Sequence, residues 1–314
     1  MRLVLVIAFT VLLTTACKRE AGQIESQSSE SKTLLEARGG FTTKLVRKET
    51  DGEPVPDPPP GVLRTVKYPS PAGELAAYVS PSPGDGKKQP AIIWIFGGFD
   101  NSIGDTAWEK GPPDNDQSAS AFREARIIMM YPSLRGGNKN PGFKEGFYGE
   151  VDDILAALDY LGKQDYVDAD RIYLGGHSTG GTLALLVAES TDRFRCVFAF
   201  GPVEAVGGYG ADNLPFDISN RRELELRAPI MWLQAIRKPT FVFEGSKQPA
   251  NVSSLRALSR AARNPSVHFH AVPGANHFSI LAPITRLVAS KIRRDDGPSS
   301  NITFTEKELS ESVK

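Results

Sequence analysis

The 314-residue chain has the composition of a globular protein, with 40% hydrophobic and 24% charged residues. Its 37 basic and 37 acidic residues cancel to a formal net charge of +0, which argues against binding a polyanion and predicts no nucleic-acid partner. The length suits one α/β domain of roughly 200–250 residues with an extension at each end.

The first 17 residues have the order of parts found in a secretory signal. Arg2 is followed by an apolar run over 3–13, small residues at 14–16, and Cys17. The apolar run is too short for a transmembrane helix, which needs ~20 residues. The sequence Leu-Thr-Thr-Ala-Cys resembles the lipobox of bacterial lipoproteins. This resemblance implies that residues 1–16 are removed as a signal peptide and that Cys17 is lipidated. The protein would then be exported and membrane-anchored, facing the periplasm or the cell surface. A plain secreted protein and an uncleaved anchor are the alternatives.

Residues 17–60 show no sustained periodicity and end in a proline-rich run at 54–60. A polar segment followed by prolines is typical of an extended, semi-rigid linker. We therefore predict a tether that separates the lipid anchor from the folded domain.

From residue 61 onward, strand and helix patterns alternate. An antiparallel pair is predicted at 62–68 and 75–80. Further strands are expected at 91–96, 126–131, 171–174, 196–200, 240–243 and 267–272, and helices at 150–163, 182–189, 254–263 and 281–292. The alternation predicts a doubly wound, mostly parallel sheet with helices on both faces.

This α/β domain is expected to span 61–296. The longest insertion between its core elements, 201–238, contains three large aromatic residues and could form a small cap over the substrate pocket. The remaining residues, 297–314, are polar and are predicted to be a loose C-terminal tail, although residues 302–304 could pack.

The motif Gly176-His-Ser178-Thr-Gly180 follows a predicted strand and precedes a predicted helix. This is the context of a nucleophile elbow, in which a sharp turn exposes a strained serine at the edge of an α/β-hydrolase sheet. Small residues two before and two after the serine avoid steric clashes. Ser178 is therefore the candidate nucleophile, and the fold class is that of the α/β-hydrolases.

The best candidate for a general base is His277, which lies in a loop after the last predicted strand and can reach the nucleophile there. His177 is adjacent to the serine and badly placed for this role. His268 and His270 alternate within a predicted strand and are expected to be structural.

The carboxylate that orients the base should lie between the serine and the histidine in chain order. Glu244 ends a predicted strand and is the only carboxylate between Pro239 and His277. Glu204, after the preceding strand, is the alternative. A weakened site with Asn251, or with no carboxylate, is a third possibility.

An oxyanion hole needs two fixed N–H donors. We expect one from the backbone of Thr179, directly after the nucleophile. The second should come from Gly98 or Phe99, in the loop after the predicted strand 91–96. No metal-ligand spacing is present, so no metal or organic cofactor is predicted.

Several segments together resemble the catalytic domain of the prolyl oligopeptidase family and related dienelactone-hydrolase-like enzymes. They are Tyr-Pro-Ser-Leu-Arg-Gly-Gly at 131–137, Gly-Glu-Val-Asp-Asp-Ile at 149–154, Tyr-Val-Asp-Ala-Asp-Arg-Ile at 166–172 and Gly-His-Ser-Thr-Gly-Gly at 176–181. The likeness extends over about 91–292. It implies that Ser178 and His277 are the nucleophile and base.

Two features depart from that family. The position of the usual family acid is occupied by Gln248, so the role of Glu244 is not implied by the resemblance. The residues between Cys17 and the domain are also too few for the β-propeller of the large oligopeptidases.

The sequence thus predicts a serine hydrolase that cleaves a small ester or peptide through an acyl-enzyme. The alternative is a non-catalytic lipoprotein that uses the hydrolase fold as a surface binding module. The missing family acid favours this alternative, and the intact serine and histidine oppose it.

Overall fold

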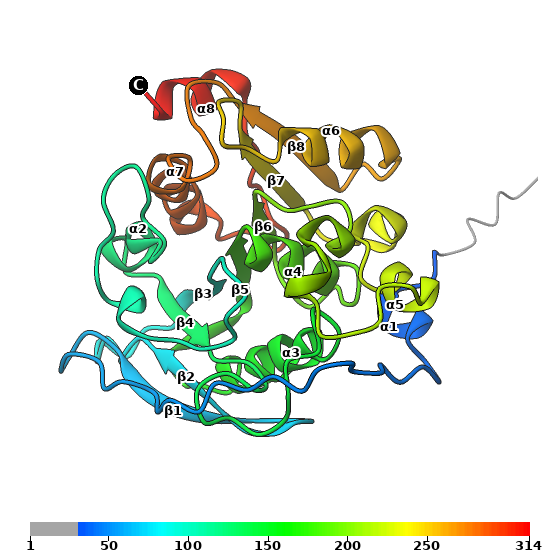
Figure 1. Ribbon diagram of the computed structural model, residues 1–314. Helices are drawn as coiled ribbons and strands as arrows, with labels where there is room; N and C mark the ends of the chain where they lie inside the picture. The colour runs from blue at the N-terminus through cyan, green and yellow to red at the C-terminus, as the bar shows by residue number, and fades with distance from the viewer. Residues whose placement is uncertain (1–30) are drawn as a thin grey trace, which may run out of the picture. The chain divides into compact units, whose positions relative to one another are not determined.

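An eight-stranded sheet runs through residues 31–314, the part of the chain that the computed structural model describes (Figure 1). The predicted signal peptide and Cys17 lie outside the described residues. The strands are β1 (Arg64–Ser70), β2 (Gly73–Val79), β3 (Gln89–Ile95), β4 (Ile128–Pro132), β5 (Val167–His177), β6 (Val197–Phe200), β7 (Thr240–Gly245) and β8 (Val267–Val272).

The strand order is β1-β2-β4-β3-β5-β6-β7-β8. Strands β3 to β8 are parallel, whereas β2 is antiparallel to both of its neighbours, β1 and β4. The predicted antiparallel start and mostly parallel sheet are therefore confirmed.

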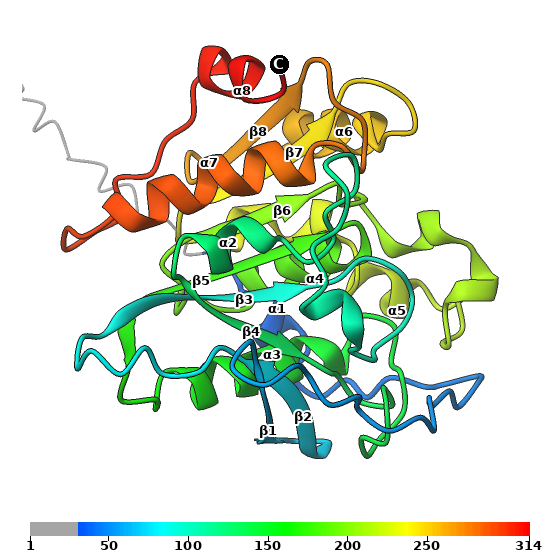
Figure 2. The same cartoon turned by 90° about the vertical axis from the view of Figure 1, so that its left-hand side faces the viewer.

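Helices cover both faces of the sheet, as predicted. They are α1 (Leu34–Ala37), α2 (Ser120–Glu124), α3 (Gly149–Leu161), α4 (Thr179–Ala188), α5 (Arg221–Glu225), α6 (Val252–Ala261), α7 (Leu281–Arg294) and α8 (Glu306–Ser312). Helices α3, α4 and α6 lie on one face, and α2 and α7 lie on the other (Figures 1 and 2).

The central strand β3 is apolar on both faces because both are covered. Ala91, Ile93 and Ile95 belong to the core on the α3 and α4 side, whereas Ile92 and Trp94 belong to the core beneath α2 and α7. Burying each of these isoleucine side chains fully contributes about 1.5–3 kcal/mol. The continuous apolar run read from the sequence thus reflects a strand with no solvent-facing side.

The segment predicted to be a tether differs from the structure over its described part, residues 31–60. Leu34 is buried, and its N–H donates to the Glu189 carbonyl at 2.9 Å. The buried Arg38 pairs with Asp152 at 2.7 Å. The polar groups of this segment make ion pairs and hydrogen bonds to the domain. Its amino-acid composition therefore resembles that of a linker, although the segment is packed.

A buried ion pair fastens this segment to the cap insertion. Glu223 on α5 and Arg227, four residues further along the chain, are both fully buried and form an ion pair. The other contacts of Glu223 come from the N-terminal segment, namely the Thr43 hydroxyl at 2.9 Å and the Lys44 N–H at 2.7 Å. Close by, Leu45 forms an isolated antiparallel bridge with Phe216.

The C-terminal residues 297–314 also pack against the domain and are not a loose tail. Ile302 and Leu309 are buried, and the Phe304 ring lies 4.9 Å from the Phe241 ring and 5.0 Å from the Phe243 ring. The apolar residues are too widely spaced in sequence to stand out among polar neighbours, yet they converge on the face of β7.

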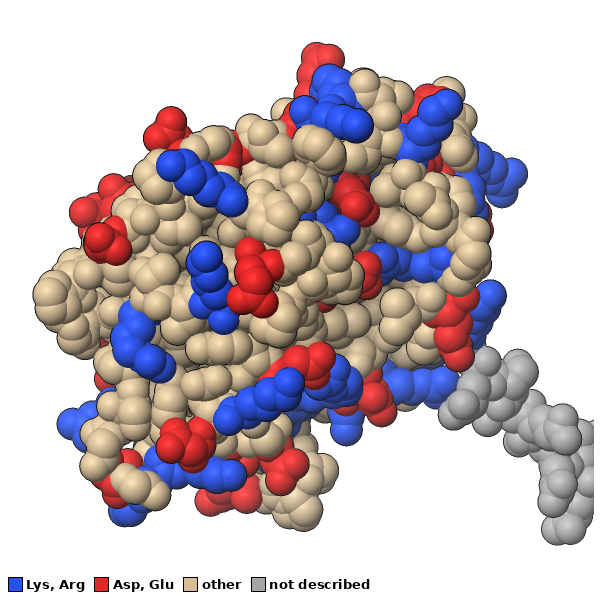
Figure 3. All heavy atoms as spheres, turned by 90° about the horizontal axis from the view of Figure 1, so that it is seen from below, with Lys and Arg blue, Asp and Glu red and all other residues tan. Residues whose placement is uncertain are grey.

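Basic and acidic side chains are interspersed over the face seen in Figure 3, which agrees with the balanced composition. Across residues 31–314 no helix is both long enough and apolar enough to cross a bilayer.

The buried pair on α5 generates a test of the N-terminal packing. Replacing Glu223 with Ala leaves the Arg227 guanidinium buried without its carboxylate partner. This should lower the free energy of unfolding by about 3–5 kcal/mol. Glu225→Ala, on the same helix, removes only a partly exposed pair with Arg222 and should cost about 0–1 kcal/mol. Urea denaturation of both variants measures the difference, and equal losses would contradict this account.

Candidate active site

Ser178 lies on the turn from β5 to α4 with a strained backbone, at φ 56° and ψ −115°. The turn is too tight for side chains on either flank. A Cβ on Gly176 would approach the Gly180 carbonyl oxygen to 2.3 Å, and one on Gly180 would approach the Ile95 carbonyl oxygen to 2.3 Å. The elbow geometry thus explains both motif glycines.

His277 and Glu244 are adjacent in the structure, although they are far apart in sequence. The Nδ1 atom of His277 lies 3.0 Å from Oε2 of Glu244, at the end of β7. Glu244 is fully buried and also accepts hydrogen bonds from the N–H groups of Gly245 at 2.7 Å and Asn251 at 3.0 Å. These donors fix the carboxylate, which in turn fixes the imidazole ring.

Gly201 makes room for this pair. Its φ of 60° is in the left-handed region, and a Cβ there would lie 2.4 Å from Cε1 of His277. Its carbonyl accepts the side-chain amide of Asn251 at 2.9 Å. The loop after β6 is therefore held against the imidazole without displacing it.

Ser178 and His277 line the same surface cavity, together with Gly97, His177 and Phe278. Because Nδ1 of His277 is occupied by Glu244, Nε2 is the ring nitrogen left for a partner in the cavity. The arrangement can accept a proton from a hydroxyl and hold the resulting imidazolium beside a carboxylate.

Among residues 31–314, neither Glu204 nor Gln248 makes a hydrogen bond or an ion pair with the His277 ring, whose carboxylate partner is Glu244. The backbone carbonyl of Glu204 accepts a hydrogen bond from the Ile230 N–H at 3.0 Å. Gln248, at the family acid position, is exposed and binds the N–H of Ala250 at 3.0 Å. The structure therefore pairs the His277 ring with Glu244, and not with Glu204 or Gln248.

Of the three residues predicted for the oxyanion hole, Thr179 lies at the elbow, and Gly98 and Phe99 lie in the loop after β3, beside it. Thr179 opens α4, where N–H groups have no acceptor within the helix. Its hydroxyl donates to the Gly98 carbonyl, which joins the two segments. Phe99 is 43% exposed, and its ring meets the Tyr209 ring edge-on at 5.3 Å.

His177 supports the His277 loop, a contact that was not expected from the sequence. Its Nε2 donates to the His277 carbonyl at 2.9 Å, and its Nδ1 lies 3.0 Å from the Gln117 side chain. Burial and the neighbouring His277 lower the pKa of His177 to about 3, so this imidazole is neutral at physiological pH. Its position beside the nucleophile in the sequence gave no sign of the His277 contact.

The predicted cap insertion consists of short helical turns beside the site. They are α5 and the 3₁₀ turns Val206–Tyr209, Ala211–Asn213, Pro229–Met231 and Leu233–Ala235. The Tyr209 hydroxyl lies 2.7 Å from the Thr182 hydroxyl on α4, so the insertion is tied to the nucleophile helix. In the described chain, 31–314, no group of three His, Cys, Asp or Glu side chains is placed to hold a metal ion.

Comparisons with known proteins identify the family and the fold. The sequence profile of the prolyl oligopeptidase family matches residues 115–286, which is more than half of the chain. Prolyl oligopeptidase A of Amanita bisporigera is 30% identical over 112 residues, covering 34% of this chain and 13% of that protein.

Solved structures show the same fold at low sequence identity. A puromycin-hydrolysing peptidase of Mycobacterium tuberculosis has a TM-score of 0.60 at 17% identity, covering 73% of this chain and 38% of that one. An esterase of Pyrobaculum calidifontis has a TM-score of 0.54 at 16% identity, covering 75% of this chain and 86% of that one.

The fold is thus that of the α/β-hydrolases. Within that class, the chain belongs to the prolyl oligopeptidase family. It spans only a small part of the curated relative described above and less than half of the mycobacterial peptidase.

The neutral His177 predicts a pH dependence of stability. Its folded pKa of about 3 lies below the ordinary value of 6.5, so between these values the unfolded chain binds a proton that the folded chain does not. Stability should therefore fall as the pH is lowered from 6.5 toward 3, by up to about 1.4 kcal/mol per pH unit.

The variant His177→Gln should flatten this slope when urea denaturation is repeated across that pH range. His268→Gln serves as the control because His268 is exposed on the edge strand β8, and it should change the slope less. An unchanged slope in His177→Gln would contradict the assignment.

Proposed function

We propose that this chain is a serine hydrolase that cleaves small esters or amides through an acyl-enzyme on Ser178, with His277 as general base and Glu244 as the acid that orients it. The observation that carries the proposal is the 3.0 Å contact between His277 and a fully buried carboxylate. It lies at a cavity that the elbow serine also lines.

In the proposed reaction, Nε2 of His277 takes the Ser178 hydroxyl proton as the serine oxygen attacks the substrate carbonyl. The imidazolium then gives this proton to the leaving alcohol or amine, which leaves an acyl-enzyme. Water, deprotonated by the same imidazole, attacks the acyl carbonyl; the bond to the Ser178 oxygen breaks, the imidazolium returns the proton to that oxygen, and the acid leaves. Glu244 stabilises the imidazolium in both halves without itself being protonated.

Backbone N–H groups are proposed to stabilise the negative charge that develops on the substrate oxygen. The Thr179 N–H at the start of α4 is one, and an N–H of Gly98 or Phe99 is the other. The hydrogen bond from the Thr179 hydroxyl to the Gly98 carbonyl supports this, because it holds the two segments together before substrate arrives. Preorganised donors of this kind lower the barrier by about 3–4 kcal/mol each.

Both ester and peptide substrates are consistent with the relatives. The family and the mycobacterial neighbour are described as peptidases, and the Pyrobaculum protein is described as an esterase. Kinetics on matched p-nitrophenyl esters and p-nitroanilides with the same acyl group will separate the two activities.

Ser178→Ala and His277→Ala should each abolish turnover of short p-nitrophenyl esters, and Ser178→Ala should also abolish labelling by a fluorophosphonate probe. Thermal unfolding checks that both variants fold. Equal labelling of the wild type and Ser178→Ala would overturn the proposal. Intact folding with no labelling of the wild type would favour the binding-module alternative.

A matched pair of substitutions tests the acid. Glu244→Gln should lower kcat by about 10⁴, because the amide no longer favours the required imidazole tautomer. Glu204→Gln removes the alternative carboxylate and should leave kcat within about twofold, as expected of a side chain that makes no hydrogen bond to His277 in the described chain. The reverse order of effects would transfer the role to Glu204.

We also propose that the enzyme is exported and anchored through lipidated Cys17, on the sequence argument alone. More than one acyl chain on Cys17 would give stable anchoring, because each buried CH₂ contributes about 0.8 kcal/mol. Metabolic labelling with an alkyne fatty acid in a bacterial host should mark the wild type and not Cys17→Ser. Labelling of both proteins would contradict the proposal.

A further inference from the structure

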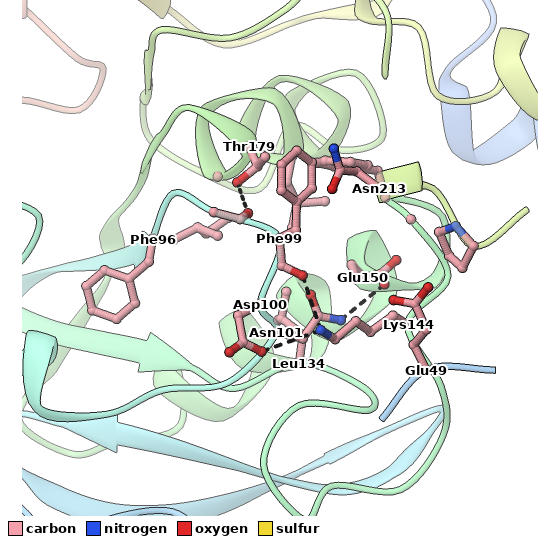
Figure 4. A pocket seen from close by; sticks show the side chains of 17 residues that line it. Glu49, Phe96, Phe99, Asp100, Asn101, Leu134, Lys144, Glu150, Thr179 and Asn213 are labelled. Carbon is pink, nitrogen blue, oxygen red and sulfur yellow. Dashed lines mark hydrogen bonds and ion pairs between the residues drawn. The ribbon is translucent and has the colours of Figure 1, made fainter. Parts of the chain in front are cut away.

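A second pocket adjoins the Ser178 cavity and shares Phe96, Gly98 and Asp100 with it. Figure 4 shows Thr179 and Phe99 on one side of this pocket, with Glu150 and Lys144 on another. Much of the lining is apolar, from Ile95, Phe99, Leu134, Phe147, Leu183 and Pro215. We call it the side pocket.

Glu150, at the start of α3, is a polar group buried in this apolar lining, with 3% of its surface exposed. Its Oε1 accepts the N–H of Glu145 at 2.7 Å and the Asn101 side-chain amide at 3.2 Å. Its Oε2 has no hydrogen-bond partner within residues 31–314. An unpartnered buried carboxyl oxygen is costly, which points to a partner that arrives with a ligand.

The charges around the side pocket favour a cation as that partner. Three carboxylates line it, and two are already paired: Glu49 with Arg47 at 2.8 Å, and Asp100 with Lys144 at 3.5 Å. Glu150 has no ion pair within the described chain.

The Arg135 guanidinium, whose charge acts on Glu150, makes its ion pairs with other carboxylates. Arg135 is held by Asp153 at 2.9 Å and by Glu145 at 2.7 Å. Burial raises the pKa of Glu150, and the Arg135 charge only partly offsets this. The charged form of Glu150 is therefore poorly stabilised, and an added cation would stabilise it.

We propose that the side pocket binds a substrate side chain with an apolar stem and a terminal ammonium, and that Oε2 of Glu150 accepts a hydrogen bond from that ammonium. This rests on the proposed hydrolase function. The pocket adjoins Thr179, which is assigned to the oxyanion, so the side chain belongs to the acyl part of the substrate, next to the scissile carbonyl. Glu150 thus determines specificity and takes no part in bond cleavage.

The test compares the p-nitrophenyl esters of N-acetyl-lysine and N-acetyl-norleucine, which differ chiefly in the terminal ammonium. The wild type should show a kcat/KM for the lysine ester at least about tenfold higher, the effect of one charge-assisted hydrogen bond. Glu150→Gln should remove this preference and leave kcat/KM for the norleucine ester within about twofold.

Glu189→Gln is the matched control. Glu189 is also a fully buried glutamate whose oxygens have no hydrogen-bond partner in the described chain, but it does not line the side pocket. This variant should retain the lysine preference. If Glu150→Gln does not fold, inhibition of the wild type by n-butylammonium but not by 1-butanol replaces the comparison.

The proposal is overturned if the wild type does not prefer the lysine ester, or if Glu150→Gln lowers both rates equally. It is also overturned if neither ester is cleaved while a fluorophosphonate still labels Ser178, a result that leaves the hydrolase function standing. Absence of both turnover and labelling would reject the two proposals together.

Discussion

Where β5 passes into α4, the backbone is packed too closely to accept another atom. A Cβ on Gly176 or Gly180 would lie 2.3 Å from a carbonyl oxygen, that of Gly180 or Ile95 respectively. Since β3 and β5 are hydrogen-bonded neighbours, this packing also fixes the loop after β3 against the serine. The positions of Ser178, Thr179 and Gly98 all depend on this close approach, and so does the proposed chemistry.

Three further strands deliver the rest of the site to the same edge of the sheet. Gly201 follows β6, Glu244 is the penultimate residue of β7 and His277 follows β8, so parallel strand ends converge as they do in other open α/β sheets. The buried Glu244 carboxylate holds His277 through one ring nitrogen, while His177 holds its backbone carbonyl. The side pocket extends this arrangement from the reacting atoms toward the substrate.

Much of the core architecture could be read from the sequence, because buried parallel strands are continuous apolar runs and the amphipathic α3 repeats at helical spacing. Glu244 could be singled out because no other carboxylate lies between Pro239 and His277. The packing of residues 31–60 and 297–314 could not be read. Their polar composition is that of linkers, and their few apolar anchors, such as Leu34 and Phe304, meet their partners only across the folded domain.

The sequence by itself determined the fold class, the elbow at Ser178 and the order of the proposed catalytic residues, because these depend on local periodicity and on motif spacing. The tertiary structure decided which carboxylate contacts His277 and that His177 is a buried neutral support. It also decided that Glu150 lies in a pocket beside the nucleophile with one oxygen unpartnered. These contacts join segments that are far apart in the chain, so local sequence patterns do not reveal them.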